Sequence, residues 1–203
     1  MLALHASFIR WAVLYVLKRA LLKAKKDSSE TPQKSGSVTL RFDGGMLEDL
    51  RNESEHKRIS LNTLATQIFR IHSEYTSMAA KAGMVSFHKS LLIRMMDSLS
   101  EDEISKLSEY IAKNEMKDTV LLMKKKYTPE AFIDFIESWA RVSGFEYRHD
   151  VSDNTHSFVI QHDMGRRWSI YIANVYKHVF SEMGAKWSDF QSTDNTVTFN
   201  VDI

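Results

Sequence analysis

Residues 37–69 decide the fold, and they read SVTLRFDGGMLEDLRNESEHKRISLNTLATQIF. The first six residues alternate polar and apolar side chains, and this period of two predicts a half-buried β-strand that ends at Gly44-Gly45. Apolar residues then recur every three or four positions, which predicts two amphipathic helices. The first helix is expected from Met46 to about Lys57, and the second is expected to begin after Ser60 as its N-cap.

One strand and two short helices cannot close a core, because the strand would leave its backbone groups unpaired and its apolar face in water. We therefore expect a second copy of the chain to supply a second, antiparallel strand. The polar side chains would then lie on the outer face of a two-stranded ribbon, which has the dimensions of the DNA major groove. These outward residues are Ser37, Thr39 and Arg41.

The stretch resembles the ribbon-helix-helix module of Arc/MetJ-type repressors over about residues 37–76. The resemblance implies an obligate dimer in which the outward strand residues, here Ser37, Thr39 and Arg41, read base edges. It also implies that the first turn of the second helix holds a backbone phosphate, since helix N-terminal amides are free donors. That role maps to Ser60, Leu61 and Asn62.

The sequence departs from the family pattern in two respects. The turn between the helices often carries a glycine in the family, whereas Lys57-Arg58 occupies it here. Residues 37–76 also hold five Lys/Arg against six Asp/Glu, so the module is not basic. Because the charges nearly cancel, the module as a whole is expected to attract DNA phosphates only weakly. The alternative interpretation is that the ribbon serves only to dimerise the chain.

The overall composition excludes several chemistries but does not identify a partner. The chain of 203 residues has no cysteine, which excludes disulfides, thiolate metal sites, iron–sulfur clusters and a cysteine nucleophile. Its 27 Lys+Arg and 26 Asp+Glu give a net charge of +1. Residues 1–26 contain six of the basic residues and no acidic one, which leaves 27 − 6 = 21 basic against 26 acidic residues elsewhere. A +6 segment is thus joined to a −5 body.

Residues 1–26 form a basic, apolar segment, and residues 27–36 form a polar linker. The longest charge-free run, Trp11 to Leu17, is shorter than the roughly 20 residues of a spanning helix. No small-residue cleavage site follows, so a secretory signal fits poorly. We expect a docked or disordered extension or an over-extended gene start. An amphipathic helix on a membrane surface is the alternative.

The DNA-binding and dimerisation module is expected to occupy 37–82 within an α+β fold. A helical connector over 84–127 and an αββαββ unit over 128–203, for sensing or oligomerisation, are expected to follow. Asp153-Asn154-Thr155 recurs 41 residues later as Asp194-Asn195-Thr196. Each Asp-Asn lies between alternating runs, which predicts two hairpins. The sequence therefore predicts a duplicated helix-hairpin domain with a four-stranded antiparallel sheet covered on one face. This part resembles, only vaguely, uncharacterised archaeal proteins with a ribbon-helix-helix module, and no function follows from that likeness.

Folding the first hairpin about Asp153-Asn154 pairs His149 with Phe158 and makes His149 and His156 diagonal neighbours, close enough to share a metal ion. His162 is too far along the strand to join them. We favour the interpretation that these histidines are satisfied by backbone and water over a ligand or metal site. Asp163 is expected to cap the following helix, where amides beside Arg166 and Arg167 could hold an anion. An Asp–His pair without a nucleophile does not indicate an enzyme.

The sequence predicts a dimeric, or higher even oligomeric, regulator that binds double-stranded DNA, in the cytoplasm and associated with the nucleoid. No cofactor is expected and no metal site is assigned. One alternative is a regulator that responds to a metal or small molecule through its C-terminal domain, in the manner of nickel-responsive repressors. Those proteins use a cysteine ligand that this chain lacks. The other alternative is a membrane-associated interaction protein that uses its ribbon only to dimerise.

Overall fold

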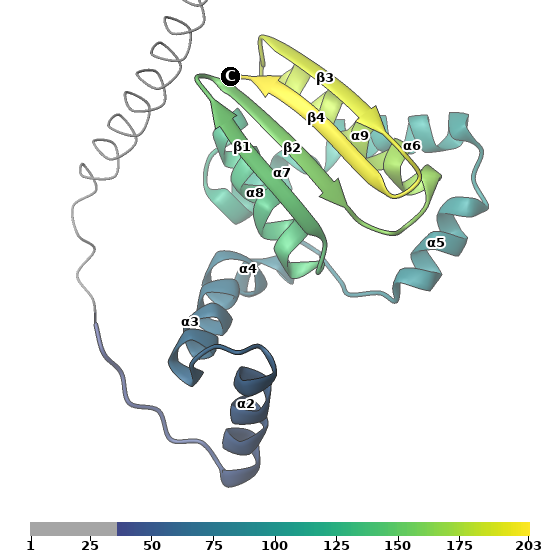
Figure 1. The fold of residues 1–203 in the computed structure, drawn as a ribbon. Helices are drawn as coiled ribbons and strands as arrows, with labels where there is room; N and C mark the ends of the chain where they lie inside the picture. Colours follow the sequence, from purple (N-terminus) through teal and green to yellow (C-terminus); the bar gives the residue numbers. More distant parts are fainter. Residues whose placement is uncertain (1–35) are drawn as a thin grey trace, which may run out of the picture. The chain divides into compact units, whose positions relative to one another are not determined.

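The computed structural model describes residues 36–203, so the expected basic segment 1–26 and residues 27–35 of the linker lie outside the described residues. Helix α2 (Gly44–His56) begins where the side chain of Asp43 accepts a hydrogen bond from the Met46 amide at 2.9 Å. Helix α3 (Leu61–Ile71) begins at Ser60, whose hydroxyl accepts from the Thr63 amide, as the sequence predicts. A π-helical turn, η1 (His72–Thr76), and the short helix α4 (Ser77–Ala79) follow (Figure 1).

The segment 36–43 forms no strand in the single chain that the structure describes. The predicted strand over 37–42 requires a second strand beside it, because backbone groups of an isolated strand have no partners in a ladder. The three apolar residues of the segment are exposed, with Val38 at 78%, Leu40 at 45% and Phe42 at 39% of their accessible surface. The strand therefore remains a prediction about the dimer.

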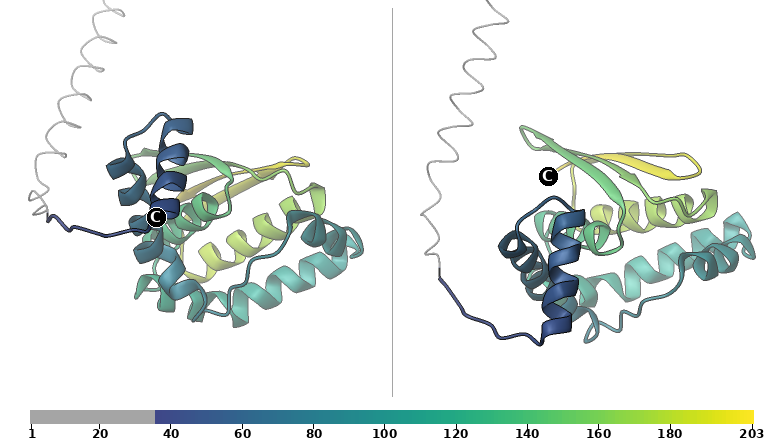
Figure 2. Two further views of the ribbon diagram at one scale, coloured as in Figure 1. Left: turned by 90° about the horizontal axis from the view of Figure 1, so that it is seen from below. Right: turned by 60° about the horizontal axis from the view of Figure 1, so that its bottom comes forward.

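Three helices connect the N-terminal elements to the sheet: α5 (Lys89–Asp97), α6 (Glu101–Asn114) and α7 (Met116–Lys124). A capping box opens α6, since Ser100 and Glu103 satisfy each other's backbone amides. Lys125, in the left-handed conformation, ends α7. Helix α6 packs along α9, the long helix that lies beneath the sheet (Figure 2).

The C-terminal part confirms the predicted order αββαββ. Its elements are α8 (Pro129–Val142), β1 (Glu146–Ser152), β2 (Thr155–Gln161), α9 (Arg166–Glu182), β3 (Trp187–Ser192) and β4 (Thr196–Asp202). Thr128 caps α8 ahead of Pro129, which occupies the first helical position. The four strands form one antiparallel sheet in the order β1-β2-β4-β3, with α8 and α9 on the same face (Figures 1 and 2).

The two hairpins are related by an approximate twofold axis through the centre of the sheet. Phe158 lies opposite Phe199 in the register of β2 and β4, and 158 + 41 = 199, so the pair maps onto itself. The same operation relates two hydrogen bonds at the ends of these strands. The His162 amide donates to the Asn195 carbonyl at 2.9 Å, and the Ile203 amide donates to the Asn154 carbonyl at 3.2 Å. The geometry thus supports the repeat that the sequence indicates.

A row of stacked rings crosses all four strands on the face that the helices cover. The centroids of His149 and Phe158 lie 3.9 Å apart, those of Phe158 and Phe199 4.8 Å, and those of Phe199 and Phe190 5.1 Å. Phe158 and Phe199 are fully buried. Burial of each such ring contributes roughly 1.5–3 kcal/mol, so this row is a main support of the sheet.

Candidate functional site

The outward residues of the expected ribbon are accessible to a partner. Ser37, Thr39 and Arg41 are all exposed in the segment 36–43. They alternate in the sequence with the exposed apolar residues, the pattern that predicts a polar and an apolar face of a ribbon. The single chain nevertheless forms no strand over this segment. Their role in base recognition remains a prediction.

The expected phosphate site lies at the first turn of α3. Ser60 is the N-cap, and its Oγ lies 2.7 Å from the Thr63 hydroxyl in addition to accepting from the Thr63 amide. The Leu64 amide donates to the Ser60 carbonyl. The amides of Leu61 and Asn62 precede Leu64 in the first turn, so no carbonyl within the helix is in position to accept from them. They lie at the N-terminal end of the helix, where Ser60 and Asn62 are exposed, and their role in holding a phosphate remains a prediction.

The second candidate site contains the predicted neighbours His149 and His156. Nε2 of His149 lies 2.9 Å from Nδ1 of His156, and Nδ1 of His149 lies 2.7 Å from Oε1 of Glu137 on α8. Their side chains are largely covered, with 14% of His149 and 27% of Glu137 exposed. Sequence reasoning missed Glu137, because nothing in its helical spacing distinguishes it from the other polar residues of α8.

This arrangement is a hydrogen-bonded chain. The two ring nitrogens that face each other are in direct contact, so they leave no room for an ion between them. Among residues 36–203, no group of three or more His, Asp or Glu side chains is arranged to hold a metal ion.

His162 has separate partners, in agreement with the expectation that it does not join the other two histidines. It is fully buried. Its Nδ1 accepts a hydrogen bond from the Met164 amide at 3.1 Å, and its Nε2 lies 2.9 Å from Oγ of Ser169. Nε2 therefore carries the proton of the neutral ring and donates it to Ser169. His162 cannot take a proton from this serine, so the pair does not activate a nucleophile.

One expectation for the start of α9 is wrong. Asp163 does not cap the helix: it has φ = 55°, and Gly165 is the N-cap residue. Asp163 therefore lies two residues before the N-cap, too early in the chain for its side chain to reach the amides of the first turn. Arg166 and Arg167, beside which the sequence leaves an anion site open, both have backbone carbonyls as partners. Arg166 donates to the Ser192 carbonyl at 2.7 Å, and Arg167 donates to the carbonyls of Asp97 and Leu99.

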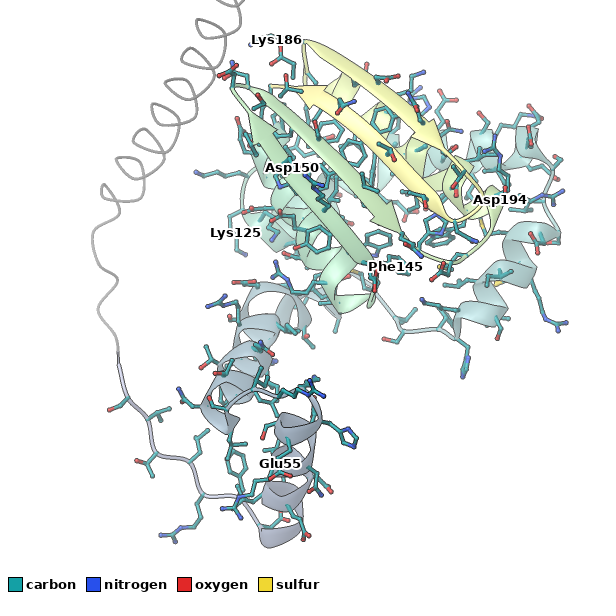
Figure 3. The ribbon with its side chains drawn as sticks, viewed as in Figure 1. Glu55, Lys125, Phe145, Asp150, Lys186 and Asp194 are labelled. Carbon is teal, nitrogen blue, oxygen red and sulfur yellow. The ribbon has the colours of Figure 1, made fainter. Side chains whose placement is uncertain are left out.

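These arginine contacts have a structural consequence. Arg166 ties the start of α9 to the end of β3, close to the turn that holds Asp194 (Figure 3). The Gly165 amide strengthens the same junction by donating to the Asn195 side chain at 3.1 Å. Arg167 attaches α9 to the end of α5. The guanidinium groups therefore satisfy carbonyls at the ends of other elements.

No family model and no curated protein matches the chain. None of the helices within residues 36–203 combines the length and apolar character that crossing a bilayer requires.

Proposed function

We propose that the chain is a dimeric, sequence-specific DNA-binding regulator in which two copies of segment 37–42 form an antiparallel ribbon for the major groove. The observation that carries this proposal is the exposure of three alternating apolar side chains, Val38, Leu40 and Phe42. A second copy would bury all three and would pair the backbone of the segment. The outward residues would then follow one face of the ribbon.

Two features of α3 support the same proposal. Ile68 and Phe69 are 42% and 52% exposed, although they lie on the same helix as the fully buried Leu64. A large exposed apolar surface on a helix indicates a partner, and a second copy is the partner that also completes the ribbon. The first turn of α3 offers uncommitted amides beside an exposed N-cap, a suitable site for a backbone phosphate.

The C-terminal domain supplies a second, larger body that can carry a signal or enlarge the oligomer. Its duplicated sheet is attached to α9, and α9 is packed along α6. We propose that the domain 128–203 serves in sensing or oligomerisation.

The proposal is tested with Arg41→Ala and the matched control Arg94→Ala, since both arginines are exposed. The assay is the mobility shift of DNA enriched by the wild-type chain from a random library, with an unrelated duplex as competitor. A base-reading arginine contributes about 1–3 kcal/mol of discrimination, or roughly 5- to 150-fold in affinity. Arg41→Ala should lose this preference and Arg94→Ala should keep it. Unchanged specificity in Arg41→Ala would refute the base-reading role.

A further inference from the structure

The internal repeat allows each position of the first hairpin to be compared with its counterpart in the second. An offset of 41 residues relates His149 to Phe190 and His156 to Val197. The rings take equivalent places, because His149 stacks on Phe158 as Phe190 stacks on Phe199. The fold therefore accepts apolar residues at both positions, and packing alone does not require the two histidines.

Glu137, the acidic partner of His149, also has no acidic counterpart in the second repeat. The two helices end in equivalent ways at an offset of 40, with Gly144 and Gly184 both in the left-handed conformation. The same offset relates Glu137 to Lys177. The hydrogen-bonded chain of Glu137, His149 and His156 thus consists of three polar residues that the second half replaces with Lys, Phe and Val.

The geometry of this chain limits how many protons it can hold. A carboxylate only accepts, so the Nδ1 atom of His149 donates its proton to Glu137. Only one proton fits between Nε2 of His149 and Nδ1 of His156, which are 2.9 Å apart. If both rings became fully protonated, two N–H groups and two positive charges would face each other at this contact. The contact must then open.

We propose that Glu137, His149 and His156 form a proton-sensing site, at which uptake of a second proton by the histidine pair releases edge strand β1 from β2. Strand β1 is the element that moves, because it pairs only with β2, whereas β2 is held on its other side by β4. The effector of this domain is accordingly the hydrogen ion. The proposal does not depend on DNA binding.

The titratable groups that act on His156 determine where the site responds. Burial and the neighbouring His149 ring lower the pKa of His156, and the carboxylates of Glu130 and Glu137 on α8 oppose this shift. An unfolded or opened histidine has its ordinary pKa of about 6.5 and binds the proton more readily. The closed state is therefore favoured above that pH, and opening becomes easier as the pH falls below it.

The test is amide hydrogen exchange of the full chain at about pH 7.5 and about pH 5.5, corrected for the intrinsic pH dependence of exchange. Edge strand β3 serves as the internal control, because it is the counterpart of β1. We expect the protection of β1 amides to fall on acidification by more than that of β3, with an excess of up to about tenfold per pH unit for one proton. The double variant His149→Phe/His156→Val should abolish the difference.

The double variant introduces the residues that the second hairpin has at the equivalent positions, so it is expected to fold. The single variant His156→Val keeps the hydrogen bond between His149 and Glu137. It provides an independent test if the double variant does not fold. His88→Gln, at an exposed histidine, is the matched control and should behave as the wild type. An equal pH response of β1 and β3 in the wild type, or an unchanged response of β1 in either variant, would overturn the proposal.

Discussion

Phe158 and Phe199 face each other across β2 and β4, and each is also the counterpart of the other in the internal repeat. Their rings stack with centroids 4.8 Å apart and planes at 12°, and neither is exposed. The approximate twofold axis of the domain therefore passes through one aromatic pair. Since both hairpins meet at this pair, its packing holds the two halves of the domain together.

Removal of one ring should strongly destabilise the domain. Phe199→Ala is expected to lower the free energy of unfolding by about 3–5 kcal/mol, because it creates a cavity among the rings of β2, β3 and α9 that contact Phe199. Val159→Ala is the control, since Val159 is 43% exposed on a neighbouring strand and should cost less than about 1 kcal/mol. Urea unfolding followed by circular dichroism measures both. Similar losses for the two variants would contradict the central position of the ring pair.

Stability should also depend on pH through His162. Burial lowers the pKa of His162, with Asp163 acting in the opposite direction and Lys89 adding to the decrease. The unfolded chain then binds a proton near pH 6.5 before the folded chain does, so the free energy of unfolding should decrease as the pH falls below that value. The limit is about 1.4 kcal/mol per pH unit for one proton.

His162→Gln keeps an acceptor for the Met164 amide and a donor for Ser169 without a titrating ring. We expect this variant to show a smaller slope of unfolding free energy against pH between about 5 and 7 than the wild type. The exposed His88→Gln should keep the wild-type slope. The assignment fails if His162→Gln titrates as steeply as the wild type.

The oligomeric state should respond to the apolar face of the ribbon segment and not to its polar face. Leu40→Lys would place a charge in the expected interface between copies, and burial of an unpaired charge is costly. Thr39→Lys, one residue away, changes the opposite face. Light scattering after size exclusion should give a monomer for Leu40→Lys and a dimer for both Thr39→Lys and the wild type. A monomeric wild type would exclude the ribbon.

Features that depend on local interactions could be predicted from the sequence. The caps at Ser60, Ser100 and Thr128 lie within three residues of the amides that they bind. The hairpin register follows from one turn, so the predicted pairing of His149 with Phe158 is confirmed. The order αββαββ and the covered face of the sheet follow from the same local patterns, because the period changes from 3.6 to 2 at each boundary.

Features that depend on contacts between distant residues were not predictable. Glu137 becomes the partner of His149 only because α8 packs beneath β1. Arg166 and Arg167 satisfy carbonyls 26 and 68–70 residues away, which no local motif indicates. Asp163 has the composition of a helix cap, but the backbone reverses there and the helix begins after Gly165. The counterparts of the histidines, however, could have been found by extending the repeat of 41 residues along both hairpins.

The central claim, that the chain is a sequence-specific DNA-binding dimer, is tested most directly by selecting bound duplexes from a random DNA library with the purified full-length protein. A two-stranded ribbon from two identical chains reads DNA with twofold symmetry. We expect enrichment of a short motif with inverted-repeat symmetry, and loss of that enrichment with Arg41→Ala. Recovery of a library without any enriched motif by the wild-type dimer would contradict the central claim.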